Sequence, residues 1–164
     1  IAICMRPKVI IADEPTSALD VVVQRRVMET LRRAQEDVGA AVILVGHDMG
    51  LMAQFVDRIA VMYAGKLVEV SPVHNVFQEP LHPYTELLIE SVPTLTEKDV
   101  LKGIQGSMPS MLELPSGCVF NPRCPYSEES CVSTPQETKE IVSGRWAACH
   151  KIDAIRNLKP MVGV

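Results

Sequence analysis

The sequence lacks an excess of basic residues and long apolar runs. Its 164 residues include 16 Lys and Arg against 20 Asp and Glu, a formal net charge of −4. Proteins are held to nucleic-acid backbones mainly by Lys and Arg, so this balance argues against a nucleic-acid partner. Apolar runs such as residues 40–45 are far shorter than the roughly 20 residues that a membrane-spanning helix needs. We therefore expect a chain that does not itself cross a bilayer.

A leader segment is also missing from the first residues. Residues 1–7 do not show the charged start, long apolar stretch and small-residue cleavage site of a secretory signal. Because the first residue is Ile rather than Met, we expect this chain to be the tail of a longer one. With 47% hydrophobic and 22% charged residues, it has the composition of a folded protein.

The first 70 residues predict an α/β fold. Short apolar runs at residues 9–12 and 41–45 are typical of buried parallel strands, and residues 21–38 show helical spacing between a capping Asp20 and a stop at Gly39. A short helix is expected to begin near Asp48 and to end before residue 57. Strand-like runs at residues 59–63 and 66–70 predict a hairpin, which we place at the edge of the parallel sheet.

The remaining residues have a different composition. Prolines recur every few residues from Pro72 onward, and only residues 85–91 and 139–143 have a helical pattern. Such a segment builds little core of its own, so we expect its cysteines to clamp it. The sequence thus predicts two regions, 1–71 and 72–164.

Three polar side chains follow the two predicted parallel strands. Asp13 and Glu14 end the first strand and His47 follows the second, so all three are expected at the carboxyl edge of the sheet, where α/β proteins bind ligands. One carboxylate to hold Mg²⁺, a second to activate water and a neutral donor to a terminal phosphate would suit hydrolysis of a phosphoanhydride. The alternative is that these residues simply end a strand and cap a helix.

Longer stretches around these residues resemble a known family. Residues 9–20 resemble the Walker B strand, catalytic glutamate and D-loop of ABC-type ATPases, and residues 42–48 resemble the strand and switch histidine of that family. Residues 57–69 resemble its edge hairpin. The second half of the chain resembles the C-terminal extension of ATP-binding subunits of oligopeptide and dipeptide ABC importers, in residues 82–93, 117–125 and 149–150.

The resemblance implies roles for individual residues. Asp13 would coordinate Mg²⁺, Glu14 would be the general base and His47 would contact the γ-phosphate of ATP. Ser17 and Asp20 would lie in the D-loop, at the interface with a second ATP-binding subunit. Members of this family power peptide import by hydrolysing ATP at the cytoplasmic face of the membrane. Their partners are transmembrane permease subunits and, indirectly, an extracytoplasmic peptide-binding protein.

Two motifs of that family do not occur in the sequence. It contains neither a Gly-x-x-x-x-Gly-Lys-Ser/Thr loop to cradle phosphates nor a Leu-Ser-Gly-Gly signature. We expect the fragment alone to be inactive and its full-length parent to be an ATPase. The alternatives are a non-transport ABC-type ATPase of chromosome maintenance or repair, a metal-stabilised interaction module without catalysis, and an importer of nickel or another small solute.

Four of the five cysteines lie in the last third of the chain, which favours a metal centre over disulfides where no secretion signal is seen. Their spacing is irregular and includes no C-x2-C pair, the usual zinc knuckle. We prefer a four-iron four-sulfur cluster, as the resemblance also implies. The alternatives are zinc, reduced thiols, or two disulfides that form when the cluster is lost in air. His150 is either a hydrogen-bond partner of this centre or a surface residue, and Cys4 is expected in the core. The predicted ligands are Cys118, Cys124, Cys131 and Cys149.

Overall fold

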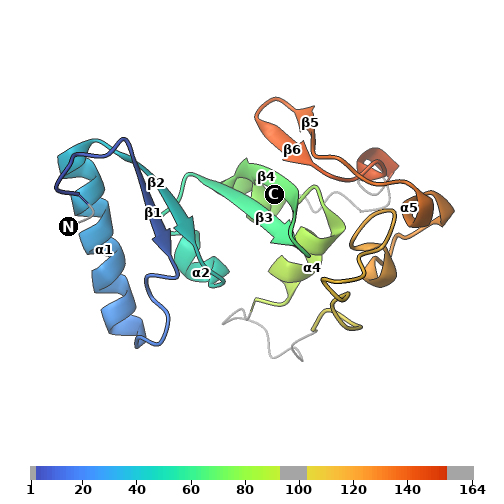
Figure 1. Ribbon diagram of the computed structural model, residues 1–164, viewed down its shortest axis with the longest axis horizontal. Helices are drawn as coiled ribbons and strands as arrows, with labels where there is room; N and C mark the ends of the chain where they lie inside the picture. Colours follow the sequence, from blue (N-terminus) through green and yellow to red (C-terminus); the bar gives the residue numbers. More distant parts are fainter. Residues whose placement is uncertain (1–2, 93–102, 155–164) are drawn as a thin grey trace. The chain divides into compact units, whose positions relative to one another are not determined.

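The computed structural model describes residues 3–92 and 103–154 (Figure 1). The chain divides into two compact units, Ile1–Val56 and Asp57–Val164. The sequence-based division into regions 1–71 and 72–164 stays a prediction. Pro93, part of one stretch that carries the family resemblance, lies outside the described residues.

The first unit is built on two parallel strands. Strand β1 (Val9–Asp13) is followed by helix α1 (Val21–Val38), strand β2 (Ala41–Val45) and the short helix α2 (Met49–Met52). In the β1–β2 pair, Val9 lies opposite Ala41 and Asp13 lies opposite Val45. This confirms the predicted strand–helix–strand order, and it brings the carboxyl ends of both strands to one edge.

Helix α1 begins and ends as the sequence predicts. Oδ1 of Asp20 accepts hydrogen bonds from the backbone N–H groups of Val22 and Val23, both at 3.0 Å, and so caps the first turn. Gly39 ends the helix with φ of 69°, a left-handed conformation that glycine adopts without steric cost.

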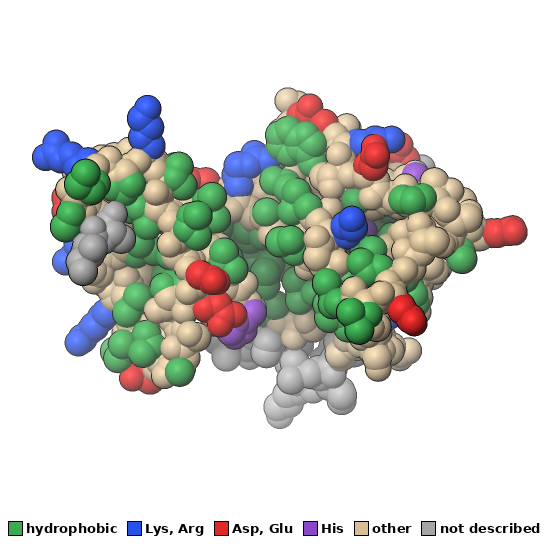
Figure 2. All heavy atoms as spheres, in the orientation of Figure 1, with side chains coloured by type: hydrophobic (Ala, Val, Ile, Leu, Met, Phe, Trp, Pro, Cys, Tyr) green, Lys and Arg blue, Asp and Glu red, His purple; other side chains and the backbone are tan. Residues whose placement is uncertain are grey.

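The prediction that both parallel strands are fully buried is wrong. Ile10 is buried, but Ile11 is 69% exposed and Ile43 is 53% exposed. Successive side chains of a strand point to opposite faces of the sheet, and the described part of this unit provides one long helix for those two faces. Figure 2 shows hydrophobic side chains at the surface of this unit. Cys4, expected in the core, is exposed.

The second unit contains an antiparallel sheet in the order β3-β4-β6-β5. The hairpin of β3 (Arg58–Tyr63) and β4 (Lys66–Pro72) is confirmed, with Gly65 at φ of 73° in its turn. Its expected place at the edge of the parallel sheet is wrong. Strand β4 pairs instead with β6 (Arg145–Ala147), which pairs with β5 (Lys139–Val142).

The helix expected at residues 139–143 is therefore strand β5. Gly144, at φ of 75°, turns the chain so that β5 and β6 form a second hairpin. The β-branched Ile141 and Val142 suit an extended conformation better than a helix. The other predicted helix is present as α4 (Pro83–Glu90), shifted slightly from residues 85–91.

Three further short helical elements lie among the described residues of this unit. They are α3 (Val73–Gln78), the 3₁₀ helix η1 (Asn121–Arg123) and α5 (Glu129–Ser133). Phe120, which is fully buried, packs edge-on against Tyr63 at 5.1 Å between ring centres and against Tyr84 at 5.4 Å. This aromatic cluster joins the loop before η1 to strand β3 and helix α4. Within the described ranges, no helix has the length and apolarity to cross a membrane.

Candidate functional site

The three polar residues predicted at the sheet edge are positioned by the parallel strands. Nδ1 of His47 lies 3.3 Å from Oε1 of Glu14. The backbone N–H of Glu14 donates to the carbonyl oxygen of Val45 at 2.9 Å, which ties the end of β1 to the end of β2. Asp13 is the last residue of β1 and is exposed. The structure therefore brings Glu14 and His47 together beside Asp13.

Glu14 has an unusual backbone conformation. Its φ is 41°, in the left-handed region that non-glycine residues rarely occupy. The side chains of Glu14 and His47 are 49% and 80% exposed, so both groups are open to solvent. Left-handed residues are common where a chain must aim a side chain at a ligand. An accessible carboxylate in contact with an accessible imidazole can accept a proton from a bound substrate or donate a proton to it.

The turn after Glu14 is held by its own hydrogen bonds. Both the backbone N–H and the hydroxyl of Ser17 donate to the carbonyl oxygen of Glu14, at 3.1 and 3.0 Å. Ala18 has φ of 60°, and Asp20 then caps α1. Ser17 and Asp20 are both exposed. The predicted D-loop is thus a well-formed turn whose side chains reach the surface.

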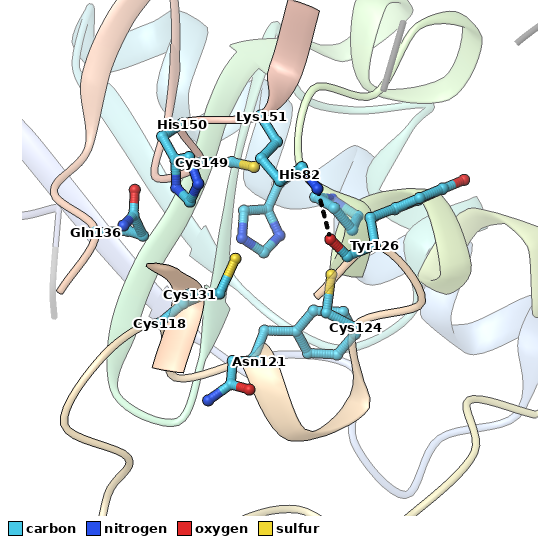
Figure 3. Close-up of a pocket in the computed structure, with 12 residues that line it drawn as sticks. His82, Cys118, Asn121, Cys124, Tyr126, Cys131, Gln136, Cys149, His150 and Lys151 are labelled. Carbon is cyan, nitrogen blue, oxygen red and sulfur yellow. Dashed lines mark hydrogen bonds between the residues drawn. The ribbon is translucent and has the colours of Figure 1, made fainter. Parts of the chain in front are cut away.

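A second candidate site is the pocket that the four clustered cysteines line (Figure 3). Cys118 and Cys124 flank η1, Cys131 lies in α5 and Cys149 follows β6. The backbone N–H of Cys118 donates to the carbonyl oxygen of Cys131 at 2.8 Å. Three separate segments therefore bring the four cysteines to one pocket.

Burial disfavours ionisation of three of the thiols that line this pocket. Burial raises the pKa of Cys124 to about 11, and the neighbouring cysteines add to the shift. Burial also raises the pKa of Cys118 and of Cys149. A metal centre ligated here would take up thiolates and release protons. A set of four soft sulfur donors suits iron–sulfur clusters and zinc better than hard cations.

His82 is a further pocket residue, and the sequence analysis assigned it no role. Its side chain is 2% exposed, and desolvation lowers its pKa to about 4, so the ring is neutral. The backbone N–H of Tyr84 donates to Nδ1 of His82 at 3.1 Å, which makes His82 the N-cap of α4. The signal in the sequence was its place before Pro83, because proline favours the first turn of a helix and the preceding residue is its cap.

A buried carboxyl group fixes the backbone around His82. Glu69, in β4, has no exposed surface. Its Oε2 accepts hydrogen bonds from the backbone N–H groups of Leu81 and His82, at 3.0 and 2.9 Å. The hydroxyl of Ser71 donates to Oε1 at 3.2 Å. Glu69 therefore anchors the loop before α4 to β4, an inner strand of the sheet.

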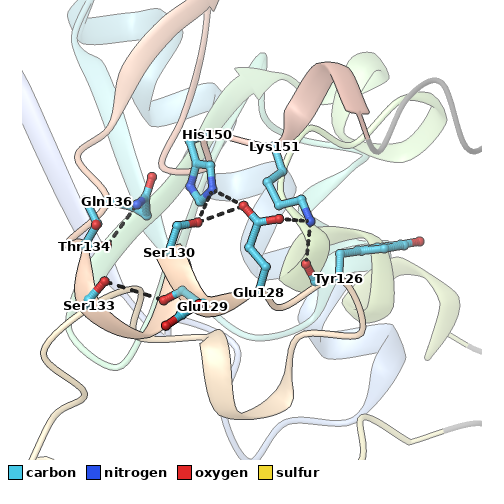
Figure 4. Close-up of polar contacts among 9 residues, drawn as sticks. All are labelled: Tyr126, Glu128, Glu129, Ser130, Ser133, Thr134, Gln136, His150 and Lys151. Carbon is cyan, nitrogen blue, oxygen red and sulfur yellow. Dashed lines mark hydrogen bonds and ion pairs between the residues drawn. The ribbon is translucent and has the colours of Figure 1, made fainter.

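A polar network lies beside the cysteine pocket (Figure 4). Nζ of Lys151 is 2.7 Å from Oε2 of Glu128, and Nε2 of His150 is 3.0 Å from Oε1. The hydroxyl of Ser130 donates to the same oxygen at 2.8 Å. The hydrogen bond from Lys151 and those from His150 and Ser130 lower the pKa of Glu128 to about 2.

This network overlaps a possible three-ligand metal group. One ligand atom each of Glu128, Cys131 and His150 lie within 4.8 Å of one another. Cys131 thus belongs both to the four-cysteine set and to this group. The Glu128–His150 contact shows that His150 has a defined partner at the surface.

Comparison with known proteins identifies the chain's relatives. Residues 68–131 match the family model described as oligopeptide/dipeptide transporter, C-terminal region. The chain is 48% identical over 150 residues to a putative peptide import ATP-binding protein of Brucella melitensis, covering 91% of this chain and 45% of that protein. It is 45% identical to the dipeptide transport ATP-binding protein DppD of Haemophilus influenzae, with the same coverage of both chains.

The oligopeptide transport ATP-binding protein OppD of Escherichia coli is 42% identical over 151 residues, which cover 92% of this chain and 44% of OppD. The chain thus spans a little under half the length of the relatives it matches. The match to the family model and the 42–48% identity over nine-tenths of the chain both point to the same group of proteins. In sequence, this chain corresponds to the C-terminal part of the ATP-binding proteins of oligopeptide and dipeptide ABC transporters.

Proposed function

We propose that the protein containing this chain hydrolyses ATP to power import of peptides. The observation that carries the proposal is the contact of Glu14 with His47 at the carboxyl edge of the parallel strands, in a chain whose relatives are named as peptide-transport ATP-binding proteins. An accessible carboxylate beside an imidazole at this edge suits phosphoanhydride hydrolysis.

Each group at the edge has a distinct role in this proposal. The carboxylate of Asp13 holds the Mg²⁺ that accompanies ATP, a hard cation that prefers oxygen ligands. Glu14 orients the attacking water and accepts its proton. His47 donates a hydrogen bond to the γ-phosphate and, through its 3.3 Å contact, keeps the Glu14 carboxylate in place. ATP supplies the free energy of the transport cycle.

The exposed turn of Ser17 and Asp20 is proposed to face a second ATP-binding subunit, identical or related. Their local hydrogen bonds preorganise this turn, which lowers the entropy cost of docking. Transmembrane permease subunits would be the other direct partners, at the cytoplasmic face of the membrane. An extracytoplasmic peptide-binding protein would act indirectly. A non-transport ABC-type ATPase, an importer of another small solute and an interaction module without catalysis are the competing functions.

The test is ATP-driven peptide uptake by the full-length gene product with its permease subunits in lipid vesicles. Glu14→Gln removes the base and keeps the size of the side chain, so uptake should fall to background. Glu29→Gln is the matched control, because Glu29 is an exposed acid on α1 that pairs with Arg25 at 3.5 Å. Uptake by Glu14→Gln equal to that of Glu29→Gln would contradict the proposal.

We propose further that Cys118, Cys124, Cys131 and Cys149 hold a four-iron four-sulfur cluster. The donor set fits, because four thiols from three segments line one pocket and cysteine thiolates are the usual ligands of such clusters. The surrounding segments are short helices and loops that bury few large apolar side chains. The cluster would stabilise this part of the fold in place of a larger core.

Zinc is the alternative, and two observations favour it. The cavity between the side chains measures about 20 Å³, close to the space of a single ion or water molecule. Glu128, Cys131 and His150 could also hold one ion. Against the second arrangement, the ammonium group of Lys151 already occupies Oε2 of Glu128 and would repel a second cation. The cluster would require the cysteine side chains to move apart when it binds.

Metal and sulfide analysis of the full-length gene product, purified without oxygen, separates these possibilities. The cluster predicts about four iron atoms and four acid-labile sulfides per chain. Cys149→Ser should abolish them, and Glu128→Gln, the control beside the pocket, should not. One zinc per chain without sulfide would contradict the cluster, and loss of that zinc in Glu128→Gln would assign it to the group of Glu128, Cys131 and His150.

A further inference from the structure

His82 is a buried titratable residue of the cysteine pocket, and the proposed function leaves its role open. It lines the same pocket as the four cysteines, and Figure 3 shows its ring projecting into the space among the labelled Cys124, Cys131 and Cys149. With 2% of its surface exposed, it is screened from bulk water. A buried imidazole aimed at a group of sulfur atoms calls for a partner for each ring nitrogen.

One hydrogen bond fixes the tautomer of this ring. Nδ1 accepts from the backbone N–H of Tyr84 at 3.1 Å, so Nδ1 carries a lone pair and no proton. A neutral imidazole then bears its proton on Nε2. Within residues 3–92 and 103–154, no other hydrogen bond to this ring is present. The Nε2–H group is therefore a donor directed to the pocket.

We propose that Nε2–H of His82 donates a hydrogen bond to a sulfur atom of the centre held by the four cysteines. The inference rests on the proposed metal centre. Neutral thiols are weak acceptors, whereas thiolate and sulfide sulfurs in a cluster carry negative charge and accept strongly. His82 is thus a positioning residue that acts on the ligands of the centre and is not itself a ligand.

The fold holds this donor rigidly. Glu69 accepts a hydrogen bond from the backbone N–H of His82. The His82 ring lies 5.9 Å from the Phe120 ring, tilted by 57°. Tyr84 holds the other side of the ring through Nδ1. Backbone and ring are therefore both fixed, as a donor to a metal ligand requires.

A hydrogen bond to cluster sulfur changes the reduction potential. One-electron reduction adds negative charge to the cluster, and the donor stabilises the reduced form more than the oxidised form. Removing the donor should therefore lower the midpoint potential. Loss of one hydrogen bond to a charged sulfur should change the ratio of oxidised to reduced cluster, at a fixed potential, by about tenfold.

Two substitutions separate the two nitrogens of His82. In His82→Asn, the short amide oxygen can still cap α4 as Nδ1 does, but nothing reaches the pocket in place of Nε2–H. In His82→Gln, the longer amide can present an N–H group near the position of Nε2, and the cap is weakened. His82→Asn therefore removes the donor to the pocket and keeps the helix cap. His82→Gln keeps a donor to the pocket and weakens the cap.

The experiment is a reductive titration with dithionite at constant pH on the full-length gene product, purified without oxygen. Electron paramagnetic resonance follows the reduced cluster, and iron and sulfide are counted in each variant. We expect His82→Asn to hold the wild-type amount of iron and to show about a tenfold higher ratio of oxidised to reduced cluster at the wild-type midpoint. His82→Gln should lie closer to wild type.

The outcomes distinguish the inference from the proposal beneath it. A wild-type protein without iron and sulfide would contradict the metal centre itself. A loaded His82→Asn variant with the wild-type potential would overturn only the role of His82. Loss of iron in both variants would show that the ring serves the fold alone, and would also overturn it.

Discussion

The carboxyl group of Glu69 accepts the backbone N–H of His82 at 2.9 Å, and so joins the inner strand β4 to the cap of helix α4. The same carboxyl group accepts from Leu81 and Ser71. A single buried side chain on the antiparallel sheet thus sets the position of a residue that lines the cysteine pocket. The antiparallel sheet and the wall of the cysteine pocket are therefore joined through the hydrogen bonds of Glu69.

Replacing Glu69 should therefore destabilise the second unit. Glu69→Ala leaves three buried donors without an acceptor, at a cost of about 3 kcal/mol or more in the free energy of unfolding. Urea denaturation of the full-length gene product, followed by tryptophan fluorescence of Trp146 in β6, would measure it. Glu113→Ala, at an exposed position, is the control. Equal stability of both variants would contradict this role.

Gly117 allows the close approach of the two segments that carry Cys118 and Cys131. A Cβ atom at residue 117 would lie 2.2 Å from the carbonyl oxygen of Cys131 and 2.5 Å from that of Val132, contacts that only backbone movement can relieve. Gly117→Ala should therefore separate Cys118 from Cys131 and reduce the bound metal severalfold. Gly103→Ala is the matched control, because a Cβ atom there meets nothing within 4 Å. Metal analysis that gives equal content for both variants would refute this explanation.

His47 is predicted to act on the phosphate end of ATP. His47→Ala removes the proposed donor and the contact with Glu14, and should lower ATP turnover by about 10²–10³-fold. His74→Ala, an exposed histidine on α3, should keep wild-type turnover. A phosphate-release assay on the full-length gene product measures both. Wild-type turnover in His47→Ala would contradict a role for His47 in ATP hydrolysis.

The local structure of the first unit could be predicted because its signals are local. Asp20 and Gly39 mark the ends of α1, and the β-branched run at residues 9–12 marks β1. The convergence of Glu14 and His47 also follows from the pattern, since parallel strands end at a common edge. Their 3.3 Å contact and the left-handed backbone of Glu14 required the structure.

Long-range pairing was not predictable in the same way. Besides β3, strand β4 pairs with β6, which lies about 75 residues later in the chain. The local sequence pattern of neither strand predicts this pairing. The helical spacing assigned to residues 139–143 failed because Gly144 and the pairing with β6 favour a hairpin. We expected the strands of the first unit to be buried because their sequences are apolar. An apolar sequence indicates that burial is favourable, but it does not show that another layer of the protein covers the strand.

The cysteine pocket was predicted from clustering and spacing, but its inner wall was not. His82 and Glu69 come from distant segments and show no metal-site spacing relative to the cysteines. A His-Pro sequence is typical of a helix start, and His82 caps α4 through Nδ1, although the sequence analysis did not assign it this role. A role for Nε2 could be inferred only once the structure showed the cysteines that surround the ring.

Steady-state hydrolysis of ATP by the full-length gene product and by its Glu14→Gln variant tests the central claim most directly. If Glu14 is the general base, the variant should bind ATP with wild-type affinity and hydrolyse it about 10²–10⁴-fold more slowly. Glu29→Gln, at the surface of α1, should behave as wild type. Equal turnover by Glu14→Gln and wild type would contradict the account, because the contact between Glu14 and His47 would then have no part in catalysis.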